Sequence, residues 1–232
     1  MTRMAITKRT LLALGIVALM TSLSFMGLFL AHQSSKENNA DLIHVACVGD
    51  SLTESSGYPE NLQTMLGDSY RVGNFGVSGS TVRLNSDLPY MDQPAFEKAK
   101  AFQPSIMVIM LGTNDATENV TDSVKEFQSD YQKLVDECQV LESNPSIWLV
   151  KPPPISENGL NLNDTNLKCD VIPCIENVAN ELNLPIIDIN AVMTNYPQYF
   201  MDGVHPSSEG AMLIANEINQ AITLNDTTAP PF

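Results

Sequence analysis

The chain has 232 residues, enough for one large domain with a sizeable core, and 44% of its residues are hydrophobic. Asp and Glu outnumber Lys and Arg by 27 to 12, which gives a formal net charge of −15 at neutral pH. Such a surface repels a phosphate backbone and excludes a nucleic-acid-binding protein. Four cysteines are also too few for a disulfide scaffold of this size.

The first 40 residues are predicted to target the chain and not to belong to the fold. Basic residues at positions 3, 8 and 9 precede the run Leu11–Ala31, which contains no charge. This run is long enough to cross a bilayer and exceeds the h-region of an ordinary signal peptide. We therefore expect an uncleaved membrane anchor that leaves the remainder extracytoplasmic, with a long, cleaved signal peptide and secretion as the alternative. A polar tether ends at Ala40, and the structured domain is expected at residues 41–232.

Beyond the tether, short apolar runs alternate with helical patterns. Strands are predicted at Ile43–Val48, Tyr70–Val77, Ile106–Leu111, Ile147–Val150 and Pro185–Ile189. Helices are predicted at Tyr58–Leu66, Val124–Leu141, Ile172–Leu182 and Ser207–Ile222, where apolar residues recur at a spacing of three and four. Apolar strands separated by helices indicate a parallel sheet covered on both faces. We therefore expect a three-layer α/β/α domain with five parallel strands.

The four cysteines leave their pairing open. Cys47 is predicted to be a buried thiol of the first strand, and Cys138 lies on the apolar stripe of a helix. Cys169 and Cys174 would point apart within one helix, but a local bridge is feasible if Pro173 is the first helical residue. Three pairings are compatible with the sequence.

Three polar blocks stand directly after predicted strands, and a fourth lies between the fifth strand and the last helix. The carboxyl ends of the strands form the edge at which parallel sheets bind ligands. The four blocks read GDSLT from residue 49, NFGVSGS from 74, GTND from 112 and DGVHP from 202. Each block alone is ordinary turn chemistry. Together they bring a serine, a histidine, an aspartate, a glycine and an asparagine to one edge of the sheet.

This set of residue types meets the requirements of acyl transfer. Ser51 is the candidate nucleophile, His205 the base that takes its proton, and Asp202 the carboxylate that orients the imidazole. The tetrahedral intermediate also needs donors for its oxyanion. The backbone N–H groups of Ser51 and Gly79 and the side-chain amide of Asn114 are the candidates for this oxyanion hole.

Two other residues compete for these roles. His44 begins the strand that leads to Ser51, and seven strand residues span roughly 23 Å, so that His44 cannot readily act as the base. Ser78 lies in a sequence that nearly matches the G-x-S-x-G nucleophile motif, but Ser80 replaces the final glycine. We therefore prefer Ser51 as the nucleophile.

The four blocks, in this order, resemble the SGNH (GDSL-type) hydrolases, and the resemblance spans about Ile43 to Ile222. It implies the flavodoxin-like fold of that superfamily and the roles named above for Ser51, Gly79, Asn114, Asp202 and His205. The stretches 70–81, 89–94 and 151–154 look like those of carbohydrate acetylesterases. One departure is that Glu54-Ser55-Ser56 stands before Gly57, where many relatives have a glycine sooner.

The predicted function is that of a serine esterase that removes short acyl groups, above all acetyl, from a glycan or small-molecule ester. The alternatives are a lysophospholipase or general lipase of the same fold and a non-catalytic, membrane-tethered carbohydrate-binding protein. The insertion Thr81–Pro104 mixes aromatic and charged residues, and we expect it to form a sugar-binding rim. No metal or nucleotide motif is present, so that no metal and no cofactor are expected. Membrane contact is expected through the N-terminal segment only, and the sequence does not specify an oligomeric state.

Overall fold

The computed structural model describes residues 42–117 and 124–226, so that the predicted anchor and tether at residues 1–40 lie outside it. Five parallel strands form one sheet in the order β2-β1-β3-β4-β5. Their bounds are β1 Ile43–Gly49, β2 Tyr70–Gly76, β3 Ile106–Met110, β4 Ser146–Lys151 and β5 Ile186–Asp188. This order is that of flavodoxin-like folds and confirms the predicted sheet.

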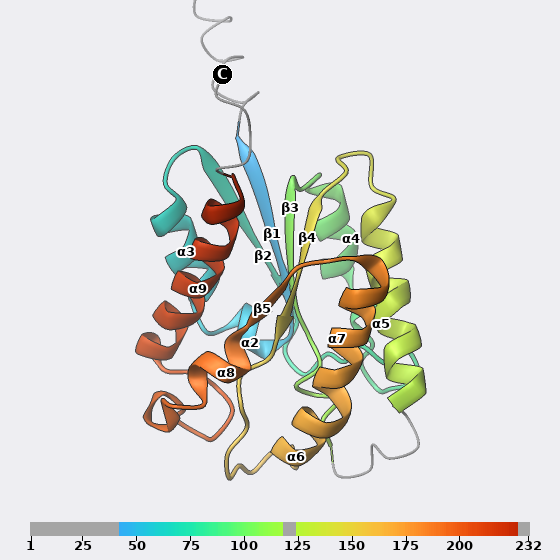
Figure 1. Ribbon diagram of the computed structural model, residues 1–232, viewed down its shortest axis with the longest axis vertical. Coiled ribbons are helices and arrows are strands. Elements are labelled where there is room, and N and C mark those ends of the chain that lie inside the picture. The colour runs from blue at the N-terminus through green and yellow to red at the C-terminus, as the bar shows by residue number, and fades with distance from the viewer. Residues whose placement is uncertain (1–41, 118–123, 227–232) are drawn as a thin grey trace, which may run out of the picture. The chain divides into compact units, whose positions relative to one another are not determined.

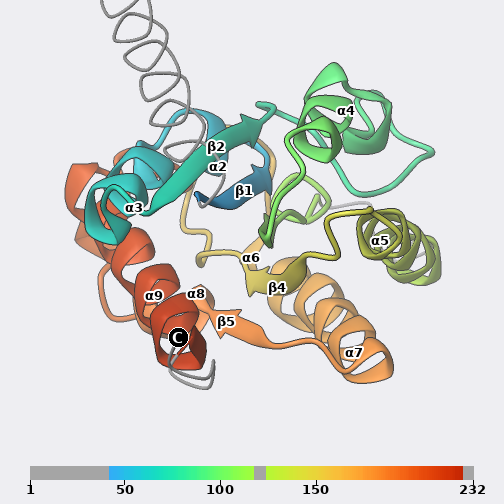
Figure 2. The same cartoon turned by 90° about the horizontal axis from the view of Figure 1, so that it is seen from above.

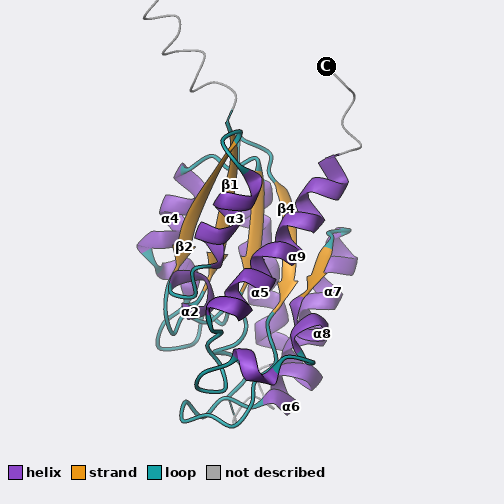
Figure 3. Ribbon diagram, turned by 90° about the vertical axis from the view of Figure 1, so that its left-hand side faces the viewer, coloured by secondary structure: helices purple, strands orange, loops and turns teal. Residues whose placement is uncertain are grey.

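Helices cover both faces of the sheet, as Figures 1 and 2 show. One face carries α3 (Tyr58–Leu66) and α9 (Ser208–Asp226), and the other carries α4 (Pro94–Ala101), α5 (Val124–Gln139) and α7 (Ile172–Leu182). The short helices α2 (Ser51–Glu54), α6 (Asp164–Asn166) and α8 (Ile189–Met193) follow strands or loops at the carboxyl edge (Figure 3). The three-layer architecture is therefore as predicted.

Burial explains why the strands form in these places. In β1, β3 and β4 the side chains are almost continuously buried, because helices lie on both sides of the sheet. The edge strand β2 is only partly buried and β5 is short, which is how natural sheets limit an exposed edge. The order reverses between β1 and β3, so that the loops after these two strands face each other across the switch point.

The expected sugar-binding rim at Thr81–Pro104 is wrong for residues 90–104, whereas Thr81, Arg83 and residues 85–88 line a pocket beside Gly79 and Asn114. Residues 94–101 form α4, which packs against β1 and β2 (Figure 1). Tyr90 and Phe96 are fully buried, and Phe102 packs on Phe75 and on the ring of His44. Alternation of charged and aromatic residues here reflects a helix that turns one face to the core, so that these aromatic rings are not available to a ligand.

The four cysteines are all free thiols. Cys47, Cys138 and Cys174 are buried, whereas Cys169 is exposed. Cys169 does not lie in a loop, because residues 167–171 form a π-helical turn that runs directly into α7. The condition for a local bridge between Cys169 and Cys174 is therefore not met.

Candidate active site

Ser51 is the first residue of α2 and follows directly on the turn that ends β1. The side chain of Asp50 caps this helix, its Oδ1 accepting a hydrogen bond from the N–H of Leu52 at 2.9 Å. The turn needs a glycine before it, because a Cβ at Gly49 would lie 1.9 Å from Thr53 Oγ1 and 2.7 Å from Met110 O. Strand, turn and cap together hold Ser51 at the carboxyl edge of the sheet.

Asp202 and His205 lie on a tight hairpin between η4 (Pro197–Tyr199) and α9. The hairpin is closed by an antiparallel bridge between Phe200 and Pro206. Within it, Asp202 Oδ1 accepts hydrogen bonds from the N–H groups of Val204 at 3.0 Å and His205 at 2.7 Å. The three-residue spacing therefore lets one carboxylate fix the backbone and the imidazole of the same loop.

The hairpin brings the three predicted catalytic residues into one chain of hydrogen bonds. His205 Nε2 lies 2.9 Å from Ser51 Oγ, and His205 Nδ1 lies 2.7 Å from Asp202 Oδ2. A carboxylate only accepts, so that Nδ1 carries the proton in the neutral ring and Nε2 is left to accept from the serine hydroxyl. This is the tautomer in which His205 can act as a base toward Ser51.

The charge state of Asp202 suits this arrangement. Partial burial by itself would raise the pKa of Asp202, but the hydrogen bonds from the backbone and ring of His205 and from the N–H of Val204 lower that pKa to about 2. Asp202 is therefore ionised near neutral pH, and it can stabilise a positive charge that develops on His205.

Two of the three predicted oxyanion-hole residues, Gly79 and Asn114, line one pocket of about 470 Å³. Gly79 has a φ of +79°, a conformation that favours glycine, and it is exposed. Asn114 Nδ2 donates to Ser80 O at 3.0 Å, and an amide has a second hydrogen to offer. The strand register places Gly49 between Gly76 and Met110, so that the loops that carry Ser51, Gly79 and Asn114 begin side by side.

Asp115, which follows Asn114, connects two loops that line this pocket. Its role was not predicted from the sequence. Asp115 is fully buried, and its carboxylate accepts hydrogen bonds from the N–H of Val82 at 2.9 Å and from the N–H and Nε of Arg83, each at 3.2 Å. Burial raises the pKa of Asp115, while these hydrogen bonds and the Arg83 charge oppose the rise. The loop after β3 is thus tied to the loop that contains Gly79.

The two competing residues have other partners. His44 Nδ1 lies 2.9 Å from Phe102 O, and its ring stacks on that of Phe102 at the amino end of β1. Ser78 is exposed, and its hydroxyl donates to the carboxylate of Glu54. The hydroxyl of Ser78 therefore meets a carboxylate and not the imidazole that contacts Ser51.

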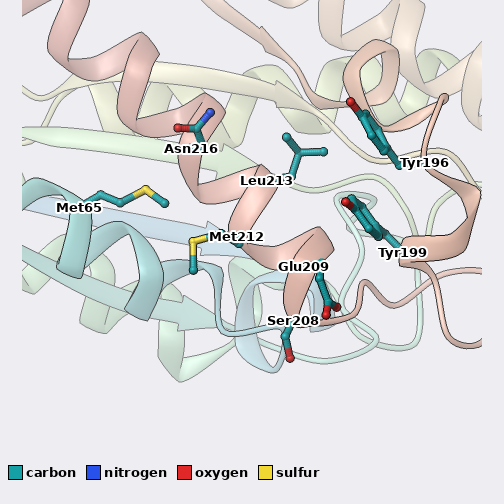
Figure 4. Close-up of a pocket in the computed structure, with 8 residues that line it drawn as sticks. All are labelled: Met65, Tyr196, Tyr199, Ser208, Glu209, Met212, Leu213 and Asn216. Carbon is teal, nitrogen blue, oxygen red and sulfur yellow. The ribbon is translucent and has the colours of Figure 1, made fainter.

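A second hollow, of about 580 Å³, lies between α3, α9 and η4 (Figure 4). Its walls are mainly apolar and include Met65, Met212 and Leu213 and the stacked rings of Tyr196 and Tyr199, whose centroids are 5.2 Å apart. None of the five predicted site residues lines it. In the part of the chain that the structure describes, no group of three or more His, Cys, Asp or Glu side chains is placed to hold a metal ion.

The fold is a flavodoxin-like α/β/α sandwich, and Ser51, His205 and Asp202 form a hydrogen-bonded chain at the carboxyl edge of its sheet. Residues 47–213 match the GDSL-like Lipase/Acylhydrolase family, and the chain therefore belongs to that family, as its motifs predicted. Its class is that of the carboxylic ester hydrolases.

Among curated proteins, the chain is 35% identical over 208 residues to an acetylxylan esterase of Xylanibacter ruminicola. It is 24% identical over 156 residues to the GDSL esterase/lipase CPRD49 of Arabidopsis thaliana. These alignments cover 78% and 58% of this chain, but only 43% and 60% of the two relatives. The chain thus spans roughly half the length of the relatives it matches.

Among solved structures, the chain resembles a carbohydrate acetylesterase family member from Sinorhizobium meliloti, with a TM-score of 0.64 and 22% sequence identity. The superposition covers 79% of this chain and 98% of that structure. At this level of identity the likeness establishes the shared fold.

Proposed function

We propose that the chain is an extracytoplasmic serine esterase that removes short acyl groups, above all acetyl, from carbohydrate hydroxyls. The observation that carries the proposal is the hydrogen-bonded chain Ser51–His205–Asp202 at the carboxyl edge of the sheet. Membership of an ester-hydrolase family favours this function over that of a non-catalytic carbohydrate-binding protein.

The proposed reaction has two halves. In the first, Ser51 Oγ attacks the acyl carbon while its proton passes to His205 Nε2, and the resulting oxyanion accepts hydrogen bonds from the N–H groups of Ser51 and Gly79 and from Asn114. The intermediate collapses when the alcohol leaves with the proton of Nε2, and the acyl group stays on Ser51. Water then repeats the sequence, giving its proton to Nε2, and the carboxylic acid departs as Ser51 regains its proton.

The pocket beside Gly79 and Asn114 supports a carbohydrate as the alcohol. Its lining offers hydroxyl, amide and carboxylate groups with some apolar surface, among them Thr81, Asn85, Ser86, Asp87, Leu160 and Leu162. A sugar presents hydroxyls and apolar ring faces, which need such a mixture of partners. The acetylxylan esterase and the carbohydrate acetylesterase that the chain resembles are consistent with this substrate class.

The proposed location rests on the sequence of the N-terminal segment, whose apolar run Leu11–Ala31 follows basic residues. Across residues 42–117 and 124–226, no helix combines the length and the apolar character that a bilayer span requires. We expect the full-length protein to remain with membranes after alkaline extraction. Its recovery as a shortened, soluble form in the medium would instead indicate secretion after cleavage.

A lipase or lysophospholipase is the second candidate, and the apolar hollow favours it (Figure 4). Each buried methylene of an acyl chain contributes about 0.8 kcal/mol, so that a long chain needs an apolar groove of this kind. The hollow borders Ser208 and Glu209, which begin α9 shortly after His205. If it holds acyl chains, the exposed Met212 would contact them.

Acyl-chain length separates the two candidates. We expect the full-length protein to hydrolyse p-nitrophenyl acetate with a higher kcat/KM than the butyrate, to leave the octanoate nearly untouched, and to release acetate from acetylated xylan. A preference that rises toward eight carbons, together with selective loss of octanoate hydrolysis in Met212→Asp, would establish the lipase. Without such a preference, Met212→Asp leaves acetate hydrolysis unchanged.

Ser51→Ala tests the mechanism, with Ser78→Ala as the matched control. Loss of the nucleophile can cost about 10⁶ in kcat, and labelling by a serine-directed phosphonate should vanish with it. Ser78→Ala should keep the label, because the Ser78 hydroxyl donates to Glu54 and not to the imidazole that contacts Ser51. The reverse pattern would make Ser78 the nucleophile.

A further inference from the structure

Glu54 connects the helix that carries Ser51 with the loop that carries Gly79. It is the last residue of α2, and its Oε2 accepts a hydrogen bond from the N–H of Ser78 at 2.8 Å and another from the Ser78 hydroxyl. Ser78 immediately precedes Gly79. The carboxylate therefore joins the helix that begins with the nucleophile to the loop that supplies an oxyanion donor.

The backbone beneath this carboxylate is already closely packed. A Cβ at Gly76 would lie 2.2 Å from the backbone nitrogen of Glu54, so that α2 can rest on the end of β2 only because position 76 is glycine. Asn74 Nδ2 donates to Glu54 O at 3.2 Å, and Asn74 Oδ1 accepts from the N–H of Gly76 at 3.1 Å. The side chain of Glu54 extends this fixed contact to the loop beyond Gly76.

Gly79 itself has little packing to hold it. A Cβ placed there would meet a single side-chain atom within 4 Å, Leu88 Cδ2 at 3.7 Å, and Gly79 is exposed. The direction of its N–H therefore depends on the hydrogen bonds of its neighbours. Ser80 N–H donates to Val77 O at 3.1 Å on one side, and the Glu54–Ser78 contact holds the other.

We propose that Glu54 is a positioning residue of the oxyanion hole, which aims the N–H of Gly79 by holding Ser78. The proposal rests on the esterase function proposed above. A carboxylate cannot donate to an oxyanion, so that Glu54 acts through Ser78 and not on the substrate. It also gives a role to the one place where this chain departs from the motif of its family, the residues directly after GDSLT.

Substitutions can separate the hydrogen bonds of Glu54 from its charge. A negative charge near the oxyanion hole opposes the developing oxyanion, so that neutralising it cannot by itself slow the reaction. Glu54→Gln keeps an acceptor of the same length, and we expect its kcat to stay within about threefold of wild type. Glu54→Ala removes the acceptor, and we expect kcat to fall about 10- to 100-fold with KM within twofold, because a misplaced donor costs transition-state and not ground-state binding.

Three further variants of the full-length protein complete the kinetic test. Glu54→Asp keeps the charge on a side chain one methylene shorter, and should lose at least about fivefold in kcat. Ser78→Ala keeps the backbone hydrogen bond to Glu54, and its kcat should fall less than about fivefold. The double variant Glu54→Ala/Ser78→Ala should be no slower than Glu54→Ala, because both substitutions act on the same Glu54–Ser78 contact. Glu60→Ala, an exposed glutamate at the start of α3, is the matched control and should equal wild type.

Amide hydrogen exchange supplies a readout that does not depend on catalysis. Exchange in a peptide that covers residues 76–82 should rise in Glu54→Ala and Glu54→Asp, but not in Glu54→Gln or Glu60→Ala. An active wild type with Glu54→Ala inside twofold of it would overturn this inference and leave the esterase function standing. An inactive wild type would overturn the esterase function, and unchanged exchange in Glu54→Ala would then overturn the Glu54–Ser78 restraint independently.

Discussion

Replacing Asp50 with asparagine should make the free energy of unfolding depend less on pH between pH 5 and 8. Asp50 is completely buried beneath Ser51, and one of its oxygens, Oδ2, accepts no hydrogen bond from the described residues. Burial raises the pKa of Asp50 from 3.8 to about 7; the hydrogen bond from Leu52 opposes the rise, and the charge of Asp115 adds to it. Asparagine keeps the oxygen that caps α2 but cannot ionise.

The sign and size of the effect follow from this shift in pKa. The unfolded chain releases the Asp50 proton above about pH 4, whereas the folded protein retains it up to about pH 7. The stability that this group contributes is therefore complete below about pH 4 and is lost as the pH rises through 7. Each pKa unit is worth about 1.4 kcal/mol, so that the loss is roughly 2 kcal/mol at pH 5 and roughly 4 kcal/mol at pH 8.

Urea unfolding from pH 5 to 8 measures the difference, with fluorescence of the single tryptophan, the buried Trp148, as the probe. Other titrating groups cancel when Asp50→Asn is compared with wild type, as does any constant cost of the substitution. The free energy of unfolding of Asp50→Asn relative to wild type should rise by about 2–3 kcal/mol over this range. The same comparison for the exposed Asp68→Asn should be flat.

The result that would refute this reasoning is a relative stability of Asp50→Asn that is constant within about 0.5 kcal/mol from pH 5 to 8. It would mean that Asp50 is ionised in the folded protein at pH 5, in spite of its burial. The helix cap alone would then account for the presence of an acid at this position.

Three further predictions concern the site. Asn114→Ala should lower kcat about 10²- to 10³-fold, because other oxyanion donors remain, and a loss below threefold would remove Asn114 from the oxyanion hole. Ester hydrolysis should fall at acidic pH, because only a neutral imidazole can accept the Ser51 proton, whereas Asp202, with a pKa of about 2, does not titrate between pH 5 and 8; a flat rate over this range with chemistry limiting would contradict a histidine base. Gly203→Ala should lower kcat more than tenfold or lower Tm by several degrees, because Gly203 has a φ of +85° and a Cβ there would lie 2.2 Å from Glu157 O. Wild-type values of both kcat and Tm would show that the hairpin adapts.

The sequence predicted the sheet and the long helices because their patterns are local and regular. The predicted helices at 58–66 and 172–182 have the observed bounds, and each observed strand lies within two residues of its prediction. α4 was missed because its stripe toward the core consists of only two buried residues, Phe96 and Ala99, between charged ones. Periodicity cannot be read from so short a stripe.

The residues of the site were found by a different signal, their place in the connections that follow strands. A parallel sheet brings such connections to one edge, so that Ser51 and His205, which are 154 residues apart, could be paired without knowledge of any distance. The pairing of Asp202 with His205 was easier to predict, because residues three apart in one loop can bring a carboxylate and an imidazole together. Their hydrogen-bonded geometry, as distinct from their proximity, is a property of the folded chain.

What could not be predicted are the contacts between loops that hold the site in place. Glu54 reaches Ser78 across 24 residues and Asp115 reaches Arg83 across 32, and neither pair has a spacing that helix or strand geometry dictates. Each depends on how closely two backbones approach, which Gly76 permits in the first case. In the sequence alone, a carboxylate after a GDSLT block looks like an ordinary solvated side chain, because its partner lies on a loop 24 residues away.

The same loops show why acidic residues can be concentrated at a site that must stabilise an oxyanion. The carboxylates of Asp202, Asp115 and Glu54 all accept backbone N–H groups, from the hairpin, from Val82 and Arg83, and from Ser78 respectively. Each negative charge is thereby directed at the backbone of a loop, where it offsets N–H dipoles, and not at the reacting oxygen. Under the proposed mechanism, the rigidity that these contacts give the oxyanion donors offsets the cost of placing the charges nearby, because preorganised donors are the larger effect in acyl transfer.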